Sequence, residues 1–83
     1  MKEYIFDGEL AGKRRKLSIW ENPDDTFSIY WDSYFLGSMY IEYIENLSAT
    51  VWVSNYNYLE PYIRVLGEFI EMCKFEDDDY EEQ

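Results

Sequence analysis

Histidine is absent from this sequence, and cysteine occurs only once, as Cys73. The lack of histidine removes the commonest general base and the commonest metal ligand of proteins. A single thiol cannot form an internal disulfide, which is typical of a reducing compartment. No apolar run approaches the roughly 20 residues of a membrane span, and none follows the first residues as a signal peptide requires. We therefore expect a cytoplasmic protein that does not enter a membrane.

Motifs for catalysis, metal binding and cofactor binding are also missing. The acids are too many and too scattered to nominate a catalytic pair, and the run 77–79 lacks the glycine turn and distant glutamate of a calcium loop. Cys73 falls on the apolar stripe of a predicted helix, where a small core side chain is a commoner role than a nucleophile. We therefore expect a protein that is not an enzyme, and we assign no catalytic residue, cofactor or metal.

Acidic and aromatic residues are abundant instead. The 83 residues carry a net charge of −11, and aromatic side chains make up 20% of them. Six acids lie in residues 76–83, which leaves twelve acids against seven bases in residues 1–75. We expect a single domain over 1–75 and a disordered acidic tail over 76–83, because a block of like charges repels itself. The negative charge disfavours direct binding to nucleic acid or to anionic membranes.

The clearest predicted element is a helix near the end of the domain. Apolar residues recur from Leu59 to Cys73 at helical spacing and form one stripe. Pro61 is tolerated only in the first turn, so the helix should begin between residues 57 and 60. Leu66 and Phe69 lie near the middle of the stripe, so we expect both to be core residues. The stripe must pack against another apolar surface, and a sheet is the only large one available.

The sheet is predicted from strand alternation and turn chemistry. Residues 22–25 read Asn-Pro-Asp-Asp, which favours a type I turn followed by a left-handed residue and pairs Ile19 with Ile29. Alternation within residues 16–31 gives the same register. Strands over 35–43 and 50–54 follow, with a β-bulge at Gly37 to align the faces, and 4–11 is a further candidate. The fold class is therefore α+β: an antiparallel sheet of four or five strands packed on one C-terminal amphipathic helix.

Four of the seven basic residues are consecutive, at positions 13–16. Such a cluster can bind phosphate or an acidic partner. It is more often a device that keeps a sheet edge from pairing with other chains. Both interpretations stay open.

The sheet face turned away from the helix is the most informative surface for function. We expect Trp20, Tyr30 and Trp52 to share it, with Tyr40 as a further member. These rings are either exposed, and then typical of a contact surface, or they serve the fold through cross-strand aromatic pairing or cover by residues 4–11. Glu42 and Glu68 stand for the acids that would act beside them, although the sequence does not select among the acidic positions.

The leading functional hypothesis is a small acidic protein-binding inhibitor or regulator with a basic partner that handles nucleic acid. Its sharpest form is a DNA mimic from a phage or mobile element that blocks a nucleic-acid-handling effector. This is an analogy based on size and charge alone. The first alternative is an immunity protein or antitoxin that neutralises a basic toxin. The second is an aromatic-faced β module that binds carbohydrate or associates with itself as a homodimer.

Overall fold

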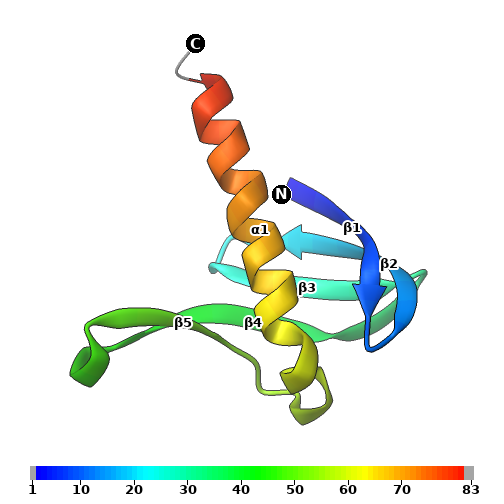
Figure 1. Ribbon diagram of the computed structural model, residues 1–83, viewed down its shortest axis with the longest axis horizontal. Coiled ribbons are helices and arrows are strands. Elements are labelled where there is room, and N and C mark those ends of the chain that lie inside the picture. Colours follow the sequence, from blue (N-terminus) through cyan, green and yellow to red (C-terminus); the bar gives the residue numbers. More distant parts are fainter. Residues whose placement is uncertain (1, 82–83) are drawn as a thin grey trace.

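The computed structural model describes the backbone of residues 2–81 and the side chains of residues 2–76. Within these residues, five antiparallel strands follow one another in chain order across one sheet, and a single α-helix packs on one face (Figure 1). The strands are β1 (Lys2–Leu10), β2 (Lys13–Glu21), β3 (Thr26–Trp31), β4 (Tyr34–Ile44) and β5 (Ala49–Val53). Short 3₁₀ helices at Glu45–Leu47 and Asn57–Leu59 precede β5 and α1 (Glu60–Glu81). The predicted α+β fold is confirmed, with five strands.

The β2–β3 hairpin forms in the predicted register. The backbone N–H of Asp25 donates to the carbonyl of Asn22 at 3.1 Å, and the N–H of Asn22 donates to the carbonyl of Thr26 at 2.8 Å. Asp25 has a φ of 68°, which is the left-handed bulge position that the turn requires. Ile19 pairs with Ile29 across the hairpin, and both are fully buried. Turn chemistry and alternation therefore define this part of the sheet.

A β-bulge interrupts the pairing of β3 with β4 at Leu36, one residue before the Gly37 at which the sequence predicts it. Tyr30 pairs with Phe35 and Ile29 pairs with Gly37, so Leu36 is the additional residue. Gly37 has a φ of 152°, and an added Cβ there would lie 2.7 Å from the Cδ1 of Leu59. A glycine is therefore needed at this position for backbone conformation and for the close approach of Leu59. The bulge brings Met39 onto the helix side, where it is fully buried.

The core lies between α1 and one face of the sheet. The predicted stripe of α1 supplies Ile63, Leu66 and Ile70 to it, and Phe69 is partly buried against it. The β1 strand also contributes, so residues 4–10 of the candidate segment 4–11 lie within the sheet and do not cover its other face. The buried apolar residues are Tyr4, Phe6, Leu10, Leu17, Ile19, Phe27, Ile29, Met39, Leu59, Ile63, Leu66 and Ile70.

Two features lie at the ends of this arrangement. The β4–β5 hairpin extends beyond the helix, and the last turns of α1 rise above the sheet (Figure 1). The α1 backbone continues to Glu81, but the side chains of 77–83 lie outside the described residues, so the disordered acidic tail stays a prediction.

Across the described part of the chain, no helix combines the length and the apolar character that a membrane crossing requires.

Candidate functional site

One whole face of the sheet has no second layer over it among the described residues, and we call it the open face. Tyr30 of β3 lies opposite Ser18 of β2, and Trp20 lies opposite Ser28, so these four side chains share the face. Trp20 and Tyr30 are only partly buried. The rings predicted here from sequence therefore project from a sheet that is covered on its helix side alone.

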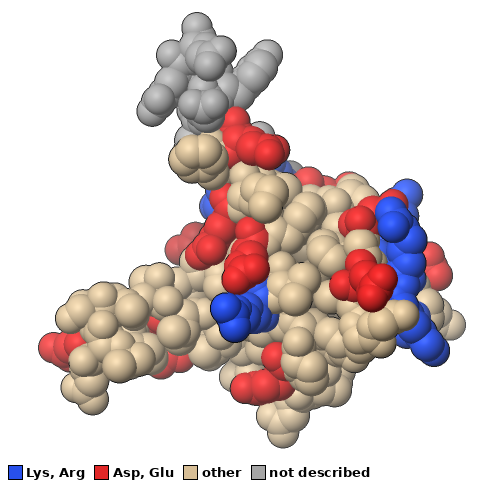
Figure 2. Space-filling model, viewed as in Figure 1, with Lys and Arg blue, Asp and Glu red and all other residues tan. Residues whose placement is uncertain are grey.

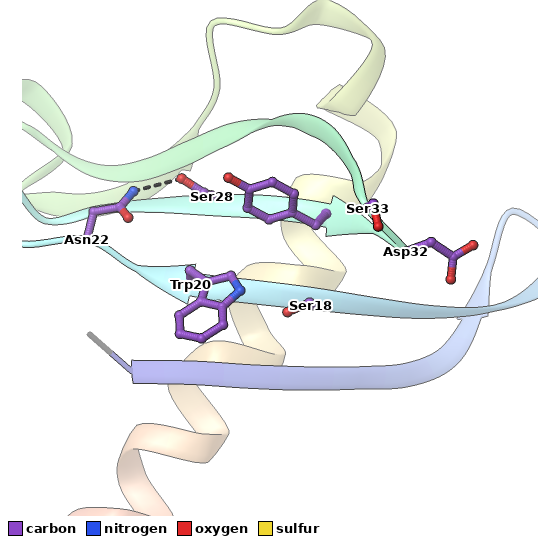
Figure 3. Close-up of a pocket in the computed structure, with 7 residues that line it drawn as sticks. Ser18, Trp20, Asn22, Ser28, Asp32 and Ser33 are labelled. Carbon is purple, nitrogen blue, oxygen red and sulfur yellow. Dashed lines mark hydrogen bonds between the residues drawn. The ribbon is translucent and has the colours of Figure 1, made fainter.

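A shallow groove of about 450 Å³ lies on the open face, and Figure 3 shows the side chains that line it. The indole of Trp20 borders it, and the hydroxyls of Ser18 and Ser28 also line it. The Asn22 amide donates to the Ser28 hydroxyl at 2.8 Å and to the Thr26 hydroxyl at 3.0 Å, which fixes its orientation. The Ser18 hydroxyl donates to the Glu3 carboxylate. The groove thus combines aromatic rings with neutral hydrogen-bonding groups and the carboxylate of Asp32.

Two further predicted residues lie on this face, farther along β4. Tyr40 pairs with Thr26 and is partly buried, so it shares the face with Tyr30 as expected. Glu42, two residues on, is exposed on the same side. Phe35 adds a ring whose centroid lies 5.5 Å from that of Tyr30, in an edge-to-face arrangement. Aromatic surface therefore continues across β2, β3 and β4.

Charge on the open face is mixed, with acids in the majority. The exposed acids of β1 alternate with its buried residues, and Glu3 is paired with Trp20 in the sheet register. One of the bases, Arg14, forms an ion pair with Asp7 at 3.1 Å. Pairing and alternation place Glu3, Asp7, Glu9 and Glu42 here together with Arg14 and Lys16.

The expectation that Trp52 shares the open face is wrong. Ile41 pairs with Trp52 and continues the helix side that Met39 begins, so Trp52 points toward α1. Its ring packs edge-on against Phe27 at 5.3 Å, and its Nε1 donates to the Glu71 carboxylate at 3.2 Å. The register of the β4–β5 hairpin determines which face of the sheet carries Trp52. The connection over residues 45–48 has no sequence signal that specifies this register, so the sequence alone does not place the ring.

Glu68 is separated from the open face as well. It is exposed on α1 and forms an i,i+4 ion pair with Arg64 at 3.4 Å. Together with Trp52 and Glu71 it lines a second groove, of about 450 Å³, between α1 and β5. The six predicted residues therefore divide between two surfaces: Trp20, Tyr30, Tyr40 and Glu42 on the open face, and Trp52 and Glu68 beside the helix.

Both signs of charge occur on the helix side of the molecule. Figure 2 shows acids along α1 with a basic side chain beside them, and a group of basic side chains flanked by acids at the end formed by β1 and β2. Burial would raise the pKa of Glu21, but hydrogen bonds from Tyr4 and Lys74, with the charges of Lys74 and Lys2, hold that pKa below its ordinary value. The Lys74 Nζ lies 3.1 Å from Glu21 Oε2, so this pair joins α1 to β2.

The single thiol is poorly suited to nucleophilic chemistry. Cys73 is partly buried against the core, and burial, followed by the charge of Glu76, raises its pKa. A raised pKa keeps the thiol protonated near neutral pH, whereas reactive cysteines have a lowered one. Among the described residues, no group of three potential ligands is placed to hold a metal ion.

Sequence reasoning missed the polar half of the open-face groove. Ser18, Ser28 and Asn22 line it, and each is an ordinary strand or turn residue with no motif around it. The one available signal is strand alternation, which places Ser18 and Ser28 on the same face as Trp20 and Tyr30.

No known protein family, curated protein or solved structure matches this chain.

Proposed function

We propose that this chain is a small acidic protein-binding inhibitor or regulator that docks its open face on a basic protein. The observation that carries the proposal is the uncovered face itself, where Trp20, Tyr30 and Tyr40 remain partly exposed among the described residues. Aromatic side chains are enriched at the centres of protein interfaces, where they act as anchors.

The net charge of the chain indicates which kind of partner surface it would bind. The net charge of −11 attracts basic surfaces and repels acidic ones, which speeds encounter and fixes orientation. A partner that handles nucleic acid carries such a surface, and the sharpest form of the proposal is a DNA mimic that occupies it inside the cytoplasm. An immunity protein against a basic toxin would use the same physics.

Affinity capture with matched variants tests this proposal. The bait is the full chain, its Trp20→Ala variant, or Tyr34→Ala as a control, because Tyr34 is an exposed ring opposite Trp31 on the helix side. We expect a basic protein to be retained by the parent and by Tyr34→Ala, and to be lost from Trp20→Ala. Retention by all three baits would remove the open face from the proposal.

Carbohydrate binding is the second candidate, favoured by the groove at Trp20. Sugars stack on aromatic rings and hydrogen-bond to neutral groups of the kind that Ser18, Ser28 and Asn22 provide. A glycan array separates the two candidates. Retention of a defined glycan in a Trp20-dependent and salt-insensitive manner would favour this function over the acidic regulator, since screening weakens only contacts between charges.

A further inference from the structure

A second hollow lies on the helix side, where the first turns of α1 meet the β1–β2 end of the sheet. Its volume is about 330 Å³, at the small end of the range for ligand pockets. Leu17, Leu59 and Leu66 line it, and the exposed ring of Trp31 forms another part of its wall. We call this hollow the basic-rimmed groove, because two cationic side chains also line it.

The two cations are Lys13 and Arg15. The guanidinium carbon of Arg15 lies 4.8 Å from the centre of the Trp31 ring, a cation–π contact that keeps the positive charge beside the apolar wall. No carboxylate lines the groove among the described residues, although the chain contains 18 acids. The local charge is therefore opposite to that of the protein as a whole.

Strand alternation divides the basic cluster between the two faces of the sheet. Arg14 and Lys16 belong to the open face, where Arg14 is paired with Asp7. Lys13 and Arg15 face the helix side and line the groove. Protection of a sheet edge does not account for the position of these two cations beside an apolar hollow.

We propose that the basic-rimmed groove binds a small carboxylate with an aromatic body. The ring of the ligand packs against Trp31 and the leucines, and its carboxylate accepts hydrogen bonds from Arg15 and Lys13. A guanidinium next to an apolar wall is well suited to this role, because its planar fork matches a carboxylate and is weakly hydrated. The groove is too small for a structured partner, and a second copy of the chain would bring a further net charge of −11 toward it.

The test uses 2-naphthoate as the probe and the indole N–H cross-peak of Trp31 in the ¹H–¹⁵N NMR spectrum as the readout. Trp31→Phe assigns that peak. The parent chain is compared with Lys13→Gln/Arg15→Gln and with Arg14→Gln/Lys16→Gln, which removes the same charge from the other face. Naphthalene-2-carboxamide serves as the uncharged analogue, and thermal melts confirm that both double variants fold.

We expect 2-naphthoate to shift the Trp31 peak in a saturable way. Affinity for 2-naphthoate should fall at least about tenfold in Lys13→Gln/Arg15→Gln, and the parent should bind the carboxamide at least about tenfold more weakly, because a charged hydrogen bond is lost. In Arg14→Gln/Lys16→Gln the affinity for 2-naphthoate should stay within about twofold of the parent's. No saturable shift at millimolar probe, equal losses in the two double variants, or equal affinity for the carboxamide would each overturn the proposal. A Trp31 peak that moves on dilution of the protein alone would identify a second copy as the occupant and overturn it as well.

Discussion

The indole ring of Trp52 occupies the space that a side chain on Gly67 would need. A Cβ added to Gly67 would come within 3 Å of three atoms of that ring. The absence of a side chain therefore allows α1 to pack directly on β5. This contact also explains why Trp52 serves the fold: its ring lies between Phe27 of the sheet and Glu71 of the helix.

The first prediction concerns this contact. Glycine to alanine in an exposed helix interior ordinarily stabilises a protein by about 1 kcal/mol. We expect Gly67→Ala to destabilise this one by about 1–3 kcal/mol, because the new methyl group overpacks the site. In a Trp52→Ala background the ring is gone, and the same substitution should become stabilising. Urea denaturation of the four proteins measures the change of sign, and an unchanged sign would contradict the packing described.

The second prediction concerns the core. Leu66 is 1% exposed, whereas its neighbour Val65 is 42% exposed. Leu66→Ala should cost about 2–5 kcal/mol of unfolding free energy, since it removes buried atoms and leaves a cavity. Val65→Ala, on the outer side of the helix, should cost much less. Thermal melts compare the two, and a Leu66→Ala melting temperature within a degree or two of the parent would refute packing of α1 on the sheet.

The third prediction is a pH dependence at Glu21. Its pKa is lowered in the folded chain, so its contribution to stability is present above the unfolded pKa, ordinarily 4.5, and disappears as the pH falls through the folded pKa. We expect Glu21→Gln to lower the free energy of unfolding near neutral pH by about 0.2–1 kcal/mol, the range for partly exposed pairs. The difference from the parent should vanish in acid. A difference that persists in acid would assign the loss to packing rather than to charge.

The fourth prediction concerns the thiol. Burial and Glu76 raise the pKa of Cys73, so the thiolate that reacts with alkylating reagents is scarce at neutral pH. Iodoacetamide should therefore label the native protein slowly at pH 7.5, and faster as the pH rises. The control is Met72→Cys in a Cys73→Ser background, because Met72 is 61% exposed on the same turn. Equal labelling rates at the two positions would contradict the raised pKa.

Much of the fold follows from local patterns, and the failures share one physical cause. The helix stripe and the β2–β3 turn are specified within about 15 residues of sequence, and the structure places Leu66 and Ile19 as those patterns predict. The face of Trp52 depends on the bulge at Leu36 and on the connection Glu45–Ser48 together, so an error of one residue reverses it. Local alternation cannot detect such an error.

The candidate site was predictable only in part for the same reason. The sequence predicts the face of Trp20, Tyr30 and Tyr40, since each belongs to β2, β3 or β4, whose turn and bulge have local sequence signals. The basic-rimmed groove could not be predicted, because it depends on how Leu59 and Leu66 meet Arg15 and Trp31 across the fold. No spacing along the chain encodes that approach.

The salt dependence of partner binding tests the central claim most directly. The parent and Trp20→Ala are compared by surface plasmon resonance, against the captured basic protein, between about 50 and 500 mM salt. We expect the parent's affinity to fall steeply, mainly through slower association, because exposed charges are screened within about 10 Å at 0.1 M. Trp20→Ala should bind more weakly at every salt concentration, by about 2 kcal/mol if Trp20 is an anchor. Affinity that depends on neither salt nor Trp20 would contradict the acidic, aromatic open face as the binding surface.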